Sequence, residues 1–490
     1  MNPIWILLVL AIYFAALYVV AHFTSKRANN ASFFKANSSA SWVLVAFGMI
    51  GTSLSGVTFV SVPGTVSAHG MQYFMMAVGF FIGYFVVAFV LLPLYYRLNL
   101  TSIYTYLDHR FGSPSYQLGA AFFILSRTLG ASLRLYLVVN VLQVLIMDAL
   151  GIPFPITAIV TLLMILAYTY RGGVKTIVWT DTLQTFFMLS ALIGCVVFVV
   201  HQLGGIQNAW NIMVETTTTD GKKNLGYLLN DHFLEKRYFL KHLIGGAFIT
   251  IAMTGLDQEM MQKNISVSNL RDSQRNMITF SAVMLGVVAL FLILGGMLYV
   301  YMQSLGLPAP YVGDDIFPKL VMDHMPPMMG LLFIIGLVSA LFPSADGAIT
   351  ALTASFCIDL LRIQKNNQSE EEQARIRKRV HLSFTALFLI IVLFFKWLNQ
   401  KTIVDVLMDV AGYTYGPLLG LFAFGILTKR SLDKRGAAVI AVCLLAPALT
   451  YVIAYFSKTW LGGYEMGVEN LPLNGLLTFF GLFLISKRAS

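Results

Sequence analysis

The chain has 490 residues, of which 57% are hydrophobic and only 11% are charged. Soluble proteins carry about 25% charged residues, so this composition excludes an ordinary soluble domain and favours a polytopic helical membrane protein. The formal charge of +10 does not indicate a nucleic-acid partner, because basic residues in the cytoplasmic loops of a membrane protein explain it better.

Apolar runs long enough to cross a bilayer follow one another along the whole chain, and we expect thirteen spans. They are 4–22, 42–68, 72–96, 115–149, 153–170, 176–201, 240–262, 277–304, 326–361, 380–399, 404–427, 436–457 and 471–486. Most basic residues fall in alternate loops, which predicts the N-terminus outside and the C-terminus inside. The first run lacks a small-residue cleavage site and is expected to stay as a helix.

Two spans contain small and polar residues that a lipid-facing helix does not need. They include Gly48–Val60, GMIGTSLSGVTFV, and Gly245–Gln262, GGAFITIAMTGLDQEMMQ. Broken helices in matching positions of two halves indicate an inverted-repeat transporter with its site at the repeat interface. We therefore predict one transmembrane domain, 1–490, with repeats 42–201 and 240–427, a peripheral first helix 4–22 and peripheral C-terminal helices 436–490.

Ionisable residues within the spans are the next signal, because each costs about 2.5–3.5 kcal/mol at the membrane centre on insertion scales. Asp346 lies in mid-span between Ser344 and Gly347, one turn after Pro343, which frees a backbone carbonyl. These oxygens suit a small cation, although Asp346 could instead cap a kinked helix or pair with an arginine. Asp181, at the start of a span, has a helix N-cap as its alternative interpretation.

Four motifs resemble the sodium/solute symporters, the family of sodium/glucose, proline, pantothenate and sialic acid cotransporters. They are Gly51–Phe59 (GTSLSGVTF), Tyr170–Gln184 (YRGGVKTIVWTDTLQ), Gly255–Lys263 (GLDQEMMQK) and Ala340–Thr353 (ALFPSADGAITALT). The resemblance covers about residues 4–488. It implies an all-α LeuT-like fold with five-plus-five inverted repeats, and a transporter, not an enzyme.

The resemblance also implies where the coupling ion, sodium, binds. The family site uses carbonyls of the first core helix and carbonyls and hydroxyls of the eighth, which here are those of Gly51, Leu54, Ala340, Pro343 and Ser344. The chain departs from the family at Pro343, where serine is usual, and at Asp346. Some members hold a second sodium with a carboxylate at the position of Asp181. We expect Asp346 to make the cation site of the eighth core helix more anionic.

The solute site implied by the resemblance lies beside the broken first core helix. Its expected contacts are Ser53, Ser55, Thr58, Tyr73 and Gln258. Arg127 and Arg134 lie one turn on either side of the position where the sialic acid members carry an arginine, and either could bind a carboxylate. The alternative is that these arginines pair with a carboxylate or a helix C-terminus, or snorkel. Sialic acid itself is not predicted, because Ala77 replaces a glutamine of those members.

The sequence therefore predicts a secondary active transporter that couples inward sodium movement to uptake of a small polar organic solute. An arginine in the solute site would favour an anionic solute. Its partners would be sodium, the solute and the lipid bilayer, with neither nucleic acid nor an obligate protein partner. Its location would be the plasma membrane, as a multi-pass protein of a bacterial inner membrane. The alternatives are proton coupling through Asp346 and a transporter-like sensor acting with a partner. A channel is disfavoured because no filter segment is visible.

Overall fold

The chain is built from helices, and the computed structural model describes residues 3–25, 33, 40–307, 311, 313–363, 369–398, 403–432 and 435–488. Within these ranges the backbone forms only isolated β-bridges and no sheet. An all-helical architecture is expected of a chain in lipid, because helices satisfy every backbone polar group within one segment.

The described residues of the first half of the chain form nine α-helices. Their bounds are α1 (Pro3–Ser25), α3 (Trp42–Ser53), α4 (Gly56–His69), α5 (Tyr73–Val86), α6 (Leu92–Arg97), α7 (Thr105–Phe111), α8 (Ser113–Leu142), α9 (Phe154–Gln202) and α10 (Ile206–Glu215). Short π-helical turns extend α5 and α8, at Val87–Leu91 and Gln143–Met147. The predicted spans 153–170 and 176–201 form the single element α9, which kinks at Gly173, where φ is +57°.

The second half continues in the same way. Its helices are α11 (Phe239–Thr250), α12 (Gln258–Asn264), α13 (Leu270–Ser304), α14 (Ile316–His324), α15 (Pro327–Ser355), α16 (Glu370–Leu398), α17 (Ile403–Leu427), α18 (Gly436–Trp460) and α19 (Asn470–Ile485). Two further π-helical turns follow α11 and α15, at Ile251–Gly255 and Phe356–Leu360.

Nine of the described helices are long and apolar enough to cross a membrane. Two bent pairs pass the same test together, α3 with α4 at 58° and α11 with α12 at 70°. Both bends lie in the two stretches that the sequence marks as interrupted, so that prediction is confirmed. The shorter apolar helices Phe154–Tyr170 and Asn470–Ile485 lie at the remaining predicted spans.

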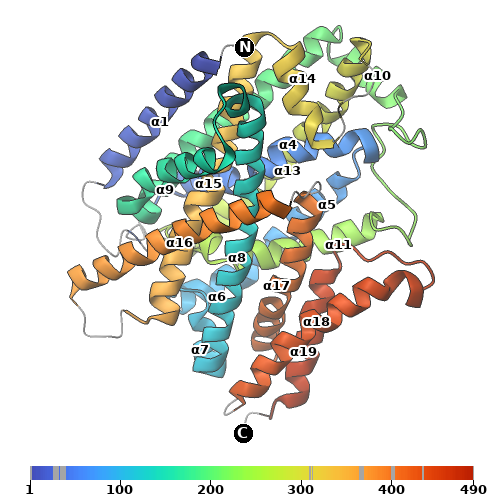
Figure 1. The fold of residues 1–490 in the computed structure, drawn as a ribbon. Coiled ribbons are helices and arrows are strands. Elements are labelled where there is room, and N and C mark those ends of the chain that lie inside the picture. Colours follow the sequence, from blue (N-terminus) through green and yellow to red (C-terminus); the bar gives the residue numbers. More distant parts are fainter. Residues whose placement is uncertain are drawn as a thin grey trace.

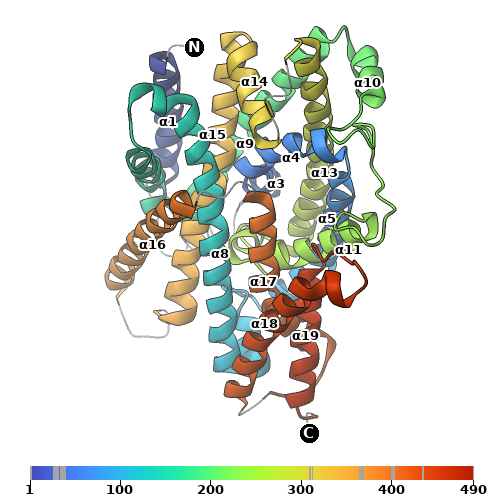
Figure 2. The same ribbon diagram turned by 45° about the vertical axis from the view of Figure 1, so that its right-hand side comes forward.

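The first bent pair packs against α9 and α15 in the interior of the bundle, and α4 also contacts α8. In the second pair, α12 contacts α15, α3 and α9, whereas α11 packs chiefly against α5. The helix α1 and the pair α18–α19 lie on opposite flanks in both views, and the two termini lie at opposite ends of the molecule (Figures 1 and 2). The two bent pairs meet where α12 contacts α3.

Close backbone contact joins α5 to α11. A Cβ atom on Gly79 would lie 2.3 Å from the Leu243 carbonyl oxygen, and one on Gly246 would lie 2.5 Å from that of Met76. Glycine is required at both positions because any side chain would separate the two helices. The contact holds one face of α5 beside the second bent pair.

Candidate functional site

The bend between α3 and α4 leaves backbone carbonyls without backbone partners. Leu54 ends α3 with φ −82° and ψ 72°, and Ser55 is extended, so the helical hydrogen-bond pattern stops here. Within the described ranges, the carbonyls of residues 51–54 accept no backbone hydrogen bond across the bend. A buried carbonyl needs a partner, and the negative end of α3 favours a positive one. The bend therefore leaves carbonyl oxygen atoms that could serve as ligands of a cation.

The bend between α11 and α12 is closed by side chains. The Tyr95 hydroxyl donates to the Gly255 carbonyl at 2.7 Å, and the Tyr104 hydroxyl donates to the Leu256 carbonyl at 2.9 Å. Asp257 caps α12, because its Oδ1 accepts from the backbone N–H groups of Glu259 and Met260 at 2.9 and 3.2 Å. Side chains of the protein therefore satisfy the carbonyls of this second bend, whereas the carbonyls of the first bend have no backbone partner among the described residues.

The open bend contacts α15 and α9. A Cβ atom on Gly51 would lie 3.5 Å from the Pro343 ring, and the Gly51 N–H donates to the Thr185 hydroxyl at 3.0 Å. Ala340 and Ser344 share a buried face of α15 with Pro343, by their spacing of three and four residues. The structure thus brings Gly51 against the helix that carries Ala340, Pro343 and Ser344, and Leu54 lies three residues further along, at the bend itself.

Asp181 lies within α9, eight residues after the kink at Gly173, and therefore does not cap a helix. The N-cap interpretation is wrong because α9 continues through this position. Asp181 is fully buried, and its Oδ2 accepts from Lys263 Nζ at 2.7 Å and from the Thr52 hydroxyl at 3.1 Å. Lys263 was not predicted as this partner, although it ends one of the four motifs.

Asp346 is also fully buried, in the middle of α15. The Tyr168 hydroxyl donates to its Oδ2 at 2.6 Å, and its Oδ1 faces the Gly347 N–H. Neither alternative is found for Asp346, because α15 continues on both sides and no basic side chain of the described residues forms an ion pair with it.

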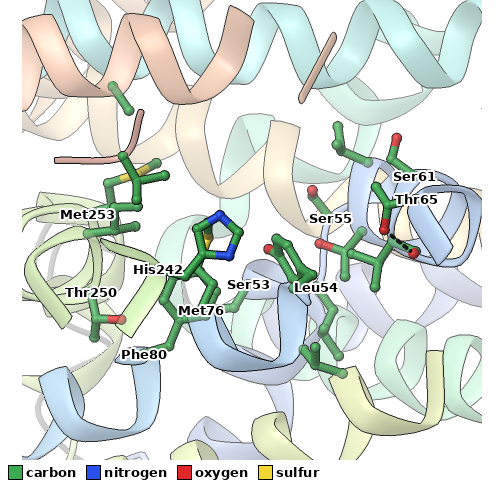
Figure 3. A pocket seen from close by; sticks show the side chains of 18 of the residues that line it. Ser53, Leu54, Ser55, Ser61, Thr65, Met76, Phe80, His242, Thr250 and Met253 are labelled. Atoms are coloured by element: carbon green, nitrogen blue, oxygen red, sulfur yellow. Dashed lines mark hydrogen bonds between the residues drawn. The ribbon is translucent and has the colours of Figure 1, made fainter. Parts of the chain in front are cut away.

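A cavity of about 390 Å³ opens beside the first bend. Ser53, Ser55, Thr58 and Tyr73, which are predicted solute contacts, line it together with both arginines of α8. Figure 3 shows the His242 ring between the Thr250 and Met253 side chains of the second bent segment and the stretch Ser53–Ser55. The volume lies within the usual range for small-molecule sites.

Gln258 lies away from this cavity. Its side chain accepts from the Ile103 N–H at 3.0 Å and donates to the Thr101 carbonyl at 2.9 Å, and the residue is fully buried. Gln258 is therefore not placed to bind a solute in the cavity, because both ends of its amide already bind backbone between α6 and α7.

The two arginines of α8 have different surroundings. Arg127 donates to Glu259 and lies 3.8 Å from Asp257 Oδ2, and only 4% of the residue is exposed. Arg134 is half-buried, lines the cavity and has no hydrogen-bond or ion-pair partner in the described part of the chain. The charge of Arg127 is neutralised by the protein, whereas the charge of Arg134 is available to a ligand.

Sequence reasoning missed one polar wall of the cavity. His242, Thr250 and Thr254 on the second bent segment all line it. Their separations of eight and four residues place them on one helical face, and such a polar stripe within an apolar span is a signal that could have identified them. Apolar side chains of α5 and α13 line the cavity as well, including Met76, Phe80 and Met284.

Comparisons with known proteins agree with this geometry. A family model described as "Sodium:solute symporter family" matches residues 33–442. The sodium/sialic acid symporter SiaT of Proteus mirabilis is 25% identical, with 88% of this chain and 86% of that protein covered. The human sodium-coupled monocarboxylate transporter 1 is 26% identical, with 79% of this chain and 62% of that protein covered.

Solved structures give the same result for the fold. A substrate-bound, outward-open Na⁺-coupled sialic acid symporter superposes with a TM-score of 0.82 at 19% identity, covering 99% of each chain. The transporter MhsT, solved with L-phenylalanine, gives a TM-score of 0.51 at 14% identity, covering 90% of this chain and 99% of that one. The all-helical LeuT-like fold expected from the sequence is confirmed.

Proposed function

The chain belongs to the sodium:solute symporter family, and from this premise we propose that it couples sodium entry to the uptake of a small organic anion. It is a sodium-coupled secondary transporter of the cell membrane with multiple spans, and not an enzyme. The names of its relatives include sialic acid and monocarboxylates as transported solutes. The proposal is therefore about the solute class and about the residues that bind it.

Arg134 is the observation that carries the anionic solute. It lines the cavity and has no partner among the residues that the structure describes. A buried or half-buried guanidinium without an anion is costly, and its fork of donors matches a carboxylate. A solute carboxylate would supply the missing partner.

The start of α4 adds a second source of positive potential. Ser55 stands at its N-cap without a side-chain capping bond, and Ser55, Val57 and Thr58 line the cavity. Free N–H groups at a helix N-terminus favour a negative ligand. With hydroxyls on this wall and Met76, Phe80 and Met253 on another, the cavity suits a carboxylate on a body with one polar and one apolar face.

The first bend is the proposed sodium site. The free carbonyls of Gly51 and Leu54, with Ala340, Pro343 and Ser344 of α15, form a set of oxygen donors of the kind that sodium takes in unwound transporter helices. Ser344 already donates its hydroxyl hydrogen to the Leu341 carbonyl at 2.8 Å, so its oxygen remains an acceptor. Sodium held between α3 and α15 would order the same bend that supplies Ser53 and Ser55 to the solute.

Coupling follows from this shared element. If sodium orders the bend and thereby raises solute affinity, the solute must raise sodium affinity by the same factor. The cavity mouth is lined by residues such as Lys236, Arg237 and Gly313, which lie in loops predicted to be outside. We therefore interpret the structure as an outward-open state, with 42–201 and 240–427 as the two repeats that move in alternating access.

The test is thermal stabilisation of the purified protein by a solute panel, with and without sodium. A ligand of the folded state raises stability by mass action, so carboxylate-bearing solutes should stabilise it, and more strongly in sodium. Arg134→Ala should weaken carboxylate binding about tenfold or more, since a hydrogen bond to a charged group contributes about 1.5–3 kcal/mol.

The matched control is Arg275→Ala, which removes an exposed arginine paired with Asp272 outside the cavity. It should leave solute binding unchanged. The anionic assignment fails if no carboxylate-bearing solute stabilises or competes, and if Arg134→Ala transports normally.

Proton coupling remains a second candidate because of one observation. Asp346 is a buried carboxyl group whose described neighbours include a hydroxyl donor, Tyr168, but no cation in ion-pair contact. A buried carboxyl without a cation readily takes a proton. Uptake driven by a pH gradient in the absence of sodium would favour this candidate over sodium coupling.

A further inference from the structure

Six ionisable side chains are buried together where α3, α8, α9, α12 and α15 meet, each at most 4% exposed. Two are cations and four are anions: Arg127, Lys263, Asp181, Asp257, Glu259 and Asp346. Burying such charges is costly unless each is paired. Arg127 is paired with Asp257 and Glu259, which leaves Lys263 as the cation on the side of α9 and α15.

The Lys263 ammonium lies among oxygen atoms from three elements. Its Nζ is 2.7 Å from Asp181 Oδ2 on α9, 2.6 Å from the Thr52 hydroxyl on α3, and 3.6 Å from Glu259 Oε1 on its own helix. Thr52 also donates to Asp181, so the three groups form one network. Carboxylate and hydroxyl oxygens from several helices are the surroundings that a bound metal cation would have.

Gly347 on α15 leaves the space that the ends of the Glu259 and Lys263 side chains occupy. A Cβ atom there would lie 2.3 Å from Glu259 Oε1 and 3.2 Å from Lys263 Nζ. Any other residue would therefore displace the ends of the Glu259 and Lys263 side chains from their present positions. The Lys263 ammonium is therefore held in one position by the packing around it and is not a mobile surface group.

We propose that the Lys263 ammonium is a built-in cation that occupies the cation position at Asp181, so that free sodium binds only at the α3–α15 site. The proposal rests on sodium coupling as argued above and goes further by fixing its stoichiometry at one sodium per cycle. Asp181, a sodium ligand by resemblance, then serves as the counter-ion of Lys263. The ammonium is bound to Asp181 Oδ2, so a sodium ion at the same carboxylate would be repelled by a fixed positive charge a few ångströms away.

The number of sodium ions bound by the purified full-length protein tests this directly. Equilibrium binding of ²²Na⁺ should saturate at one ion per wild-type chain. Lys263→Gln should free Asp181 and raise the plateau about twofold, and Lys263→Arg should keep it at one. The double variant Asp181→Asn with Lys263→Gln should return it to one, because the carboxylate is then absent.

A second measurement decides the case if Lys263→Gln does not fold. Asp181→Asn alone should bind one sodium with wild-type affinity, because Asp181 contacts Lys263 and not sodium. A loss of sodium binding in Asp181→Asn, or a wild-type plateau of two ions, overturns the proposal. An unchanged plateau in folded Lys263→Gln does so as well.

The matched control is Lys241→Gln on the same bent segment. Lys241 is also buried, 6% exposed, and has its own carboxylate neighbour, Glu469, at 3.6 Å. It should leave the sodium count at the wild-type value. A wild-type protein that binds no sodium would refute the coupling itself, whereas one that binds two would refute only the role of Lys263.

Discussion

Arg127 and Arg134 lie two turns apart on α8, and both reach the wall of the cavity. The sequence could predict that an arginine in this span had a role, because a charge at membrane depth needs a reason. It could not predict which arginine, since the carboxylates that neutralise Arg127 come from α12, over one hundred residues later. The same limit explains why Asp181 was predicted as a sodium ligand while its contact with Lys263 was not.

Asp346 gives a test at this scale. Asp346→Asn removes a negative charge from α15 beside Ser344 and should weaken apparent sodium affinity about tenfold, or about 1.4 kcal/mol. The measurement is a sodium titration of solute-induced thermal stabilisation. Tyr168→Phe is the matched control, because it removes the hydrogen bond to Asp346 but leaves the charge in place.

Unchanged sodium affinity in Asp346→Asn, with uptake retained, would contradict a role of Asp346 in sodium binding. Loss of a pH-driven uptake in the same variant, with sodium affinity intact, would assign the residue to proton coupling.

The two bent helix pairs differ although the sequence describes them alike. Glycine and small residues predicted both interruptions, and both exist. Nothing local predicted that the second would be sealed, because Tyr95 and Tyr104 lie about 150 residues before Gly255 and Leu256, the residues whose carbonyls they bind. Tertiary hydrogen bonds therefore decide which bend is satisfied by the protein itself and which is left open, the bend proposed to receive the cation.

The substitution Tyr104→Phe tests whether these hydrogen bonds stabilise the second bend. Without the hydroxyl, the buried Leu256 carbonyl loses its partner, which should lower the free energy of unfolding by about 1–3 kcal/mol. Thermal unfolding in detergent measures the loss, and sodium affinity should remain at the wild-type value. Tyr299→Phe is the matched control, because Tyr299 is buried on α13 and its hydroxyl makes no hydrogen bond with the described residues.

A stability loss of the same size in both variants would show that the ring environment matters and the Leu256 carbonyl does not. Reduced sodium affinity in Tyr104→Phe would indicate that the second bend also takes part in cation binding.

At the scale of the whole molecule, hydropathy and the positions of basic residues predicted the bundle, its spans and an orientation with the N-terminus outside. The fold is confirmed by superposition on a solved symporter. The size and exposure of the cavity could not be predicted, because they depend on how far the two halves are apart in one conformational state. Sequence patterns describe the helices in every state equally well.

The membrane orientation of the protein and the side to which the cavity opens can be tested together. Thr65 lines the cavity on α4 and is half-buried, whereas the three native cysteines, Cys195, Cys357 and Cys443, are buried. Thr65→Cys should react with a membrane-impermeant thiol reagent added to intact cells, and the wild-type protein should not. Labelling only in inside-out vesicles would reverse the predicted topology.

The contact between Lys263 and Asp181 also has an electrical consequence. One elementary charge moved through 100 mV gains or loses about 2.3 kcal/mol. If Lys263 remains with the protein and one sodium accompanies one monocarboxylate, each cycle carries no net charge across the membrane. Uptake would then produce no current, and its driving force would not depend on the membrane voltage. The steepest solute gradient that the protein could sustain would equal the concentration ratio of sodium alone.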